Sequence, residues 1–319
     1  MSMTTKPTLS RILIFGASGH IGKPLATFLT QRDPNVKLRL VTSALEKVQG
    51  LQKDFPLAEV VVANFFDLPS LERAASDVQG VFLITPSATD EQLAMTNIVT
   101  AFKKSNSVIH IIRLLGMFPE FNRHRIPTAL QGGRSLPVQH PIAKAILDES
   151  GLPVTYINSG ASFMDNLFLQ IKSVQAEGKL IWPEHRVPFI DPRDIAEVAG
   201  QLLLSHDAKH IGQFHTMNNG ADWLEFQEIA VILGDVLGGH IPYDDSEESF
   251  VRFYEPILGP FTVKSMWHFF KFEQANEVCW ALNNFVERTI GRKPKTVREW
   301  LVEHREALSE GLRLGHATA

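Results

Sequence analysis

Three glycines spaced three residues apart form the segment of the chain whose chemistry is easiest to interpret. Gly16, Gly19 and Gly22 follow the apolar run Ile12-Leu13-Ile14-Phe15. A buried strand that turns sharply into a helix leaves backbone N–H groups directed at one point, and such a turn holds a pyrophosphate. Gly16 would permit the bend, Gly19 the close approach of phosphates, and Gly22 the close packing of helix on sheet. The other interpretation is a glycine turn without a ligand.

A second residue with chemical potential is His140, which precedes Pro141 and stands four residues before Lys144. Because proline favours the first position of a helix, we expect His140 to cap a helix at the positive end of its dipole. The dipole and Lys144, a solvated helix lysine, should lower the pKa of the imidazole. A neutral His140 could donate a hydrogen bond to a substrate carbonyl or order a water molecule. Alternatively, it only caps the helix or contacts a ribose.

The elements that position these residues follow an alternating pattern. The helix after the glycines carries Ile21, Leu25, Phe28 and Leu29 at helical spacing. Further strands are predicted at 37–41, 60–62, 81–84, 108–112 and 154–157, and helices at 68–78, 93–102 and 141–149. Parallel strands need crossover helices between them. The pattern therefore predicts an α/β fold with a doubly wound parallel Rossmann sheet.

The second half of the chain is less regular. Residues 189–191 predict a strand, and 194–203 a capped helix that returns to the core. We expect a dinucleotide-binding domain over 1–164, completed by about 187–217, and a smaller, mainly helical substrate lobe formed by 165–186 and 218–319. The lobe's aromatic residues should form its core, although some could line an apolar pocket at the lobe boundary. They are Phe250, Phe253, Tyr254, Phe261, Trp267, Phe269, Phe270, Phe272 and Trp280.

Composition excludes several classes of protein. A chain of 319 residues with 44% hydrophobic residues can build a sizeable core. Its net charge of −4 and the absence of Lys/Arg clusters argue against a nucleic-acid partner. No signal segment, membrane-length apolar run or cysteine pair is present, since Cys279 stands alone, so we expect a cytoplasmic protein without a membrane partner. A homodimer remains open.

No metal site is predicted. His185 beside Glu184, and His124 between Arg123 and Arg125, lack the spacing of a convergent ligand set. We expect these side chains to lie on solvated loops.

Several motifs, taken in order, resemble the NmrA-like group of atypical short-chain dehydrogenase/reductases. They cover nearly the whole chain and comprise the glycine turn at 16–22, Asn64-Phe65-Phe66-Asp67-Leu68-Pro69-Ser70-Leu71, Val81-Phe82-Leu83-Ile84-Thr85-Pro86, the stretch 188–196, and 289–294. The resemblance implies that the protein binds NAD(P)(H). It also implies that Gly16, Ser18, Gly19, His20 and Ile21 surround the pyrophosphate, that Asn64 and Phe65 lie by the adenine, and that Thr85 and Pro86 pass beneath the nicotinamide half.

The end of the second predicted strand bears on the choice of nucleotide. An acidic side chain there would bond both ribose hydroxyls of NAD, but Thr42 and Ser43 occupy this position. Many relatives carry an arginine at the position that Thr42 occupies here. The absence of this arginine weakens the case for NADP as well. Thr42, Ser43, Lys47 and also Lys23 could hold a 2′-phosphate, unless Lys47 is simply an exposed helix lysine. We predict NADP(H) in preference to NAD(H).

The catalytic residues of ordinary short-chain dehydrogenases are missing. None of Tyr156, Tyr243 and Tyr254 is followed four residues later by lysine, and Leu115 replaces the usual serine. At the corresponding helix the resemblance places His140, where quinone and dye reductases often have histidine. Much of the rate of such a reaction comes from holding the substrate close to the hydride donor of the cofactor. A missing tyrosine therefore does not exclude turnover.

The predicted function is reduction of a bulky, apolar, conjugated small molecule such as a quinone, enone, imine or aromatic ketone. Met117, Phe118, Phe163 and Asn166 are expected near the substrate, the last two by resemblance to an aromatic-then-asparagine pattern of the family. A nucleotide-sensing regulator without turnover, or a redox-neutral isomerase or cyclase, are the alternatives.

Overall fold

A computed structural model describes residues 5–117, 126–131, 136–276 and 281–310. Its centre is a seven-stranded sheet with the strand order β10-β6-β5-β4-β1-β2-β3, in which every neighbouring pair is parallel. The strands are β1 (Arg11–Ile14), β2 (Lys37–Thr42), β3 (Glu59–Val62), β4 (Gly80–Leu83), β5 (His110–Leu115), β6 (Val154–Ser159) and β10 (Phe214–Met217). This arrangement confirms the predicted Rossmann fold.

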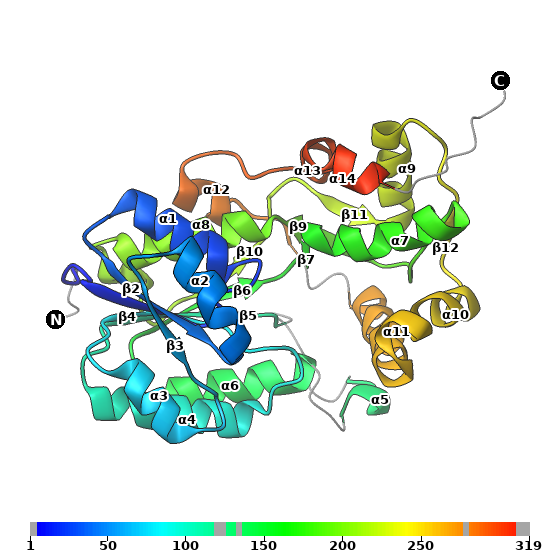
Figure 1. Cartoon of the computed structure of the whole chain (residues 1–319). Helices are drawn as coiled ribbons and strands as arrows, with labels where there is room; N and C mark the ends of the chain where they lie inside the picture. The colour runs from blue at the N-terminus through cyan, green and yellow to red at the C-terminus, as the bar shows by residue number, and fades with distance from the viewer. Residues whose placement is uncertain (1–4, 118–125, 132–135, 277–280, 311–319) are drawn as a thin grey trace.

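Helices cover both faces of this sheet (Figure 1). Ile12 and Ile14 face one layer, and Leu13 and Phe15 the other, because successive side chains of a strand point to opposite faces. The first layer consists of α1 (Gly22–Arg32), α2 (Val48–Asp54), α8 (Pro192–Leu204) and α12 (Phe285–Ile290). The second consists of α3 (Leu68–Ala75), α4 (Glu91–Ser105) and α6 (Leu136–Ser150).

Two expectations about these helices are wrong. The helix predicted to begin at residue 93 begins at Glu91, so that Ala94 and Met95 turn inward and Leu93 is 47% exposed. His140, expected at a helix cap, lies inside α6, because that helix starts at Leu136 and accommodates a proline in its interior. The loss of one backbone hydrogen bond at that proline does not end the helix.

The second lobe packs beside the carboxyl ends of the central strands (Figure 1). Its helices are α7 (Leu167–Glu177), α9 (Phe226–Leu237), α10 (Glu247–Leu258), α11 (Pro260–Ala275), α13 (Val297–Glu303) and α14 (Arg305–Ser309). Its short strands are β7 (Ser162–Phe163), β8 (Leu180–Ile181), β9 (Arg186–Ile190), β11 (Trp223–Glu225) and β12 (Tyr243–Asp244). They form a β11-β9-β7 sheet and a β12-β8 pair. Short helices are α5 (Thr128–Gln131), η1 (Leu45–Lys47), η3 (Met164–Asn166) and η4 (Ala208–His210).

Aromatic side chains form much of the core of this lobe, as predicted for Phe250, Tyr254 and Trp267. Phe261 is an exception, because it is 84% exposed. Trp280 and Cys279 lie outside the described residues. β10 belongs to the central sheet, whereas β9 pairs within the lobe, and α12 packs on α8. The exact division of the chain into domains stays a prediction. None of the described helices is long and apolar enough to cross a membrane.

Close contact between α1 and β1 depends on Gly22. A Cβ atom at this position would lie 2.2 Å from the backbone oxygen of Gly16 and 2.9 Å from Cα of Ala17. The helix could accept a side chain there only by moving away from the sheet.

We predict that Gly22→Ala lowers the free energy of unfolding by about 3 kcal/mol, because backbone atoms must shift to admit the methyl group. Thermal unfolding followed by circular dichroism would measure the change. Gly50→Ala is the matched control, since a Cβ there meets nothing within 4 Å and alanine is the better helix former. Equal melting temperatures for the two variants would contradict the argument.

Candidate functional site

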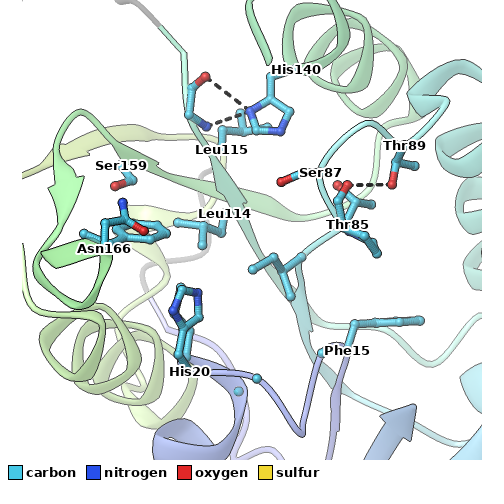
Figure 2. A pocket seen from close by; sticks show the side chains of 18 of the residues that line it. Phe15, His20, Thr85, Ser87, Thr89, Leu114, Leu115, His140, Ser159 and Asn166 are labelled. Carbon is cyan, nitrogen blue, oxygen red and sulfur yellow. Dashed lines mark hydrogen bonds between the residues drawn. The ribbon is translucent and has the colours of Figure 1, made fainter. Parts of the chain in front are cut away.

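One cavity of about 840 Å³ runs along the carboxyl ends of the central strands and into the second lobe. Figure 2 shows His20, Thr85, His140 and Asn166 arranged around it. All of the residues predicted to hold the nucleotide line this cavity: Gly16, Ser18, Gly19, His20, Ile21, Gly22, Thr42, Ser43, Lys47, Asn64, Phe65, Thr85, Pro86 and His140. The structure brings these residues together, and their binding roles stay predictions.

Of the predicted substrate residues, Phe163 and Asn166 line the cavity. Met117 is not among the lining residues, and its backbone N–H donates to Oδ1 of Asn158 at 2.6 Å. Phe118 lies outside the described residues.

The glycine turn offers backbone donors without partners. Gly16 has a φ of +66°, and a Cβ there would lie 2.8 Å from Cγ2 of Ile84, so that both conformation and space favour glycine. Within the described chain, the backbone N–H groups of Ser18, His20 and Ile21 make no hydrogen bond, and no side chain caps α1. Unpaired N–H groups at the start of a helix form an anion site. The turn therefore fits a pyrophosphate.

A carboxylate stands beside this anion site and is hydrogen-bonded to a histidine. Nδ1 of His20 bonds to Oδ2 of Asp165, which comes from η3 in the other lobe. This hydrogen bond raises the pKa of His20. The ring also meets the edge of Phe163, with centroids 5.4 Å apart. The pair joins the turn to the second lobe and offsets a negative charge that would repel phosphate.

The end of β2 is polar and carries no carboxylate on the cavity wall. Oγ1 of Thr42 accepts the N–H of Ala44 at 3.1 Å, so this buried hydroxyl is already engaged, while Ser43 and Lys47 are exposed. Lys23, which we considered for a 2′-phosphate, pairs instead with Asp54 at 2.7 Å and does not line the cavity.

The two residues expected beside the adenine are neighbours that follow β3. Oδ1 of Asn64 accepts the N–H of Phe66 at 2.9 Å, which leaves its second lone pair for a ligand. The ring of Phe65 stacks on Phe15, with centroids 5.1 Å apart.

A buried ion pair lies behind Thr85. Nη2 of Arg113 donates to Oε1 of Glu91 at 2.9 Å, and both side chains are essentially inaccessible to solvent. The same Nη2 donates to Oγ1 of Thr85 at 3.0 Å, and the threonine hydroxyl donates to Glu91. This network fixes Thr85 where β4 ends.

His140 is a neutral hydrogen-bond donor in this structure. Its Nδ1 lies 2.7 Å from the backbone nitrogen of Gly116 and 3.3 Å from the carbonyl oxygen of the same residue. The shorter contact is with an amide N–H, which can only donate, so it favours the tautomer with the ring proton on Nε2. Burial lowers the pKa of His140 to about 3, with a further contribution from the positive charge of Arg113. The expected direction is confirmed, but its causes are burial and Arg113 rather than the helix dipole and Lys144.

No tyrosine lines the cavity among the residues the structure describes. The hydroxyl of Tyr156 donates to Asp148 at 2.8 Å, behind α6, and Nζ of Lys144 lies 4.8 Å from the Tyr156 ring centre. Lys144 also forms an ion pair with Asp148, whereas we expected a solvated helix lysine. Leu115 lines the cavity where ordinary relatives have serine. A phenol therefore does not reach the reacting end of this cavity.

The expectation for His185 is also wrong. It is 2% exposed and lines the cavity, although we expected a solvated loop residue. Nε2 of His185 lies 3.5 Å from Oε2 of Glu273 on α11, a residue that the sequence did not single out. In the sequence near His185, only Trp182 and the apolar residues of β9 could have indicated that this side chain is buried. In the described part of the chain, no three His, Cys, Asp or Glu residues are grouped to hold a metal.

Comparison with known proteins agrees with this geometry. The sequence model of the NmrA-like family matches residues 8–301. A (4-alkanoyl-5-oxo-2,5-dihydrofuran-3-yl)methyl phosphate reductase from Streptomyces griseus is 24% identical over 310 residues, which cover 93% of this chain and 99% of that protein. A nitrogen metabolite regulation-like protein from Gibberella fujikuroi is 26% identical over 212 residues, 62% of each chain.

The fold is also found among solved structures. An NADPH-dependent quinone oxidoreductase from Escherichia coli, solved in complex with NADPH, superposes with a TM-score of 0.76 at 19% identity, covering 92% of this chain and 99% of that one. Because the family match spans nearly the whole length, it confirms the resemblance seen in the motifs. The chain belongs to the NmrA-like family.

Proposed function

We propose that this protein binds NADP(H) and reduces a bulky, apolar, conjugated small molecule such as a quinone, enone, imine or aromatic ketone. The observation that carries the proposal is the single cavity, which joins an anion-binding glycine turn to a wall of aromatic side chains. Bound NADPH would supply the hydride. The S. griseus and E. coli proteins, named as a reductase and an NADPH-dependent oxidoreductase, support this class of reaction.

The roles of the residues follow from their positions. The free N–H groups of Ser18, His20 and Ile21 hold the pyrophosphate. Phe65 and Asn64 receive the adenine, and Ser43 and Lys47 face the 2′-phosphate. Thr85 and Pro86 lie under the nicotinamide half, at the edge where β4 ends.

The substrate end of the cavity is served by different side chains. Nε2–H of His140 donates to the substrate oxygen and holds it in place while the hydride is transferred. Phe163 and Asn166 form the adjoining wall. Because no tyrosine reaches this end, the proton comes from water that the cavity admits.

A regulator that binds the nucleotide without turnover is the second candidate. It is favoured by the lack of a cavity-lining tyrosine and by the name of the G. fujikuroi relative. An enzyme oxidises NADPH when given an acceptor, whereas a regulator binds the two redox forms with different affinity and consumes neither. An isomerase would convert its substrate with no net change in NADPH.

The proposal is tested by titration with NADPH and NADH, followed by a screen of quinones, enones and imines at the nicotinamide absorbance. We expect tighter binding of NADPH and acceptor-dependent loss of absorbance. Gly19→Val should abolish both, because its side chain would occupy the space of the phosphates beside the free N–H groups of Ser18 and His20. Since a Cβ at residue 19 would lie 3.2 Å from the backbone oxygen of Gly16, a tight contact, circular dichroism must show that the variant is folded. Lys47→Ala should weaken NADPH binding about tenfold and leave NADH unchanged. Binding retained in Gly19→Val would refute the assignment of the turn.

We predict that His20→Ala weakens NADPH binding about tenfold or more, because it leaves Asp165 charged beside the pyrophosphate. Asp165→Asn in the same chain should restore much of the affinity, since the repulsion is then gone. Fluorescence titration of NADPH would measure all three proteins. If the double variant binds no better than His20→Ala, charge neutralisation is not the role of His20.

His140→Ala should lower kcat/KM about 100-fold, as loss of a preorganised donor to a substrate oxygen does. His140→Gln, which keeps an N–H donor, should retain part of the rate. Since the pKa of His140 is about 3, the imidazole is neutral at higher pH, so no step in the pH–rate profile between pH 5 and 8 should disappear in these variants. Unchanged turnover and cofactor affinity in His140→Ala would remove this residue from the mechanism.

A further inference from the structure

The lobe end of the cavity holds two buried polar side chains that the proposed chemistry does not use. Glu273 on α11 and His185 just before β9 are 7% and 2% exposed, and both line the cavity. Oε2 of Glu273 and Nε2 of His185 lie 3.5 Å apart. Around them the wall is apolar, with Phe226, Phe269 and Phe270 among the lining residues. Polar groups are costly in such surroundings unless they have partners.

The His185 ring is held rigidly in its neutral form. It stacks on Phe270 and tilts against Phe226, with centroids 4.8 and 4.7 Å away. Its Nδ1 lies 2.9 Å from the carbonyl oxygen of Pro183, and a carbonyl can only accept, so the proton is on Nδ1. Burial lowers the pKa of His185 to about 4, so Nε2 is an acceptor that faces Glu273.

Glu273 is accordingly an uncharged acid at neutral pH. Burial raises its pKa from 4.5 to about 8. Among the described residues, one nearby cation acts on the pair, since the charge of Lys271, which lies over the Trp267 ring, lowers the pKa of His185. The other ionisable groups on α11 and α10 are exposed or half-buried: Lys264, His268, Glu247, Glu248, Glu255, and Arg252, which pairs with Glu177. Glu184 accepts the backbone N–H groups of Phe226 and Gln227, Arg186 on β9 pairs with Glu225 and Glu228, and α5 has no ionisable group.

Two further polar atoms at the cavity lack partners. Nε1 of Trp182 and Oε1 of Gln170 are buried and make no hydrogen bond within the described structure, and both residues line the cavity. Buried donors and acceptors are normally satisfied, so these two atoms call for a partner, which a ligand or a water molecule at this end of the cavity would supply. Together with a carboxyl group that can donate and accept, they match an oxygen-bearing group without charge.

We propose that Glu273 and His185 form a specificity site that hydrogen-bonds an uncharged oxygen, a carbonyl or hydroxyl group, on the ring of an aromatic substrate. The inference rests on the proposed function for the presence of such a substrate. The acid O–H donates either to His185 or to the ligand, and its carbonyl oxygen accepts. An ionised Glu273 would instead select a cation. Binding of an uncharged or a cationic ligand therefore distinguishes the protonated from the ionised form.

The test compares Glu273→Gln with Glu273→Leu by calorimetry, with and without NADP⁺. The probes are 2-methyl-1,4-naphthoquinone and 2-methylnaphthalene, which lacks the oxygens. We expect the wild-type protein to prefer the quinone about tenfold, Glu273→Gln to keep that preference, and Glu273→Leu to lose it. Between pH 6 and 9 the wild-type affinity should fall as Glu273 ionises, whereas that of Glu273→Gln should stay constant.

A second measurement needs no ligand. Between pH 4.5 and about 8 the folded protein retains a proton on Glu273 that the unfolded chain has lost, so this group makes the fold less stable as pH rises. The melting temperature of Glu273→Gln relative to wild type should therefore increase from pH 5 to pH 8.

A melting difference independent of pH would overturn the proposal, as would equal binding of the two probes by the wild-type protein. Tighter binding of 2-naphthylmethylamine, with affinity rising with pH, would show a carboxylate site for cations and overturn it as well. Failure of the proposed function has a different signature, since NADPH then goes unbound or unoxidised while the melting profiles still report on Glu273.

Discussion

The candidate site depends on the buried ion pair between Arg113 and Glu91. Two charges without access to water are tolerated only as partners, and removing one from such a pair costs about 3–5 kcal/mol. The pair connects β5 to the first turn of α4 and holds Thr85 between them. Its cationic end also helps to keep His140 uncharged. This one interaction thus fixes Thr85 at the end of the sheet and adds to the effect of burial on the pKa of His140.

The two lobes are held together by charged contacts that lie outside the cavity. Arg193, in the first turn of α8, binds Asp191 and reaches Glu303 at the end of α13, both at 2.6 Å. Arg292 likewise binds Asp194. Because β9 and α8 are consecutive in the chain but belong to different lobes, these contacts fix the angle at which the aromatic wall faces the glycine turn.

Predictions from the sequence were most accurate for elements whose structure is determined by neighbouring residues. The strand, turn and helix around Gly16 are determined by neighbouring residues, and parallel strands then require the rest of the sheet. His140 was placed at a cap because Pro141 looked like a first helical residue, yet packing of α6 on α4 favours a longer helix. His185 lies between charged neighbours, and it is buried by Phe226 of α9 and by α11, both far along the chain. Such burial depends on tertiary contacts that no local pattern contains.

One helix supplies three of the side chains that line the lobe end of the cavity. α11 contributes Phe269, Phe270 and Glu273, and it packs on α10 and α5 rather than on the central sheet. Substitutions on this helix can therefore alter which molecule fits without disturbing the glycine turn or the Arg113 network. This separation allows related chains to diverge in the compounds they act upon while keeping a common nucleotide, since the two requirements are met by parts of the protein that mutate independently.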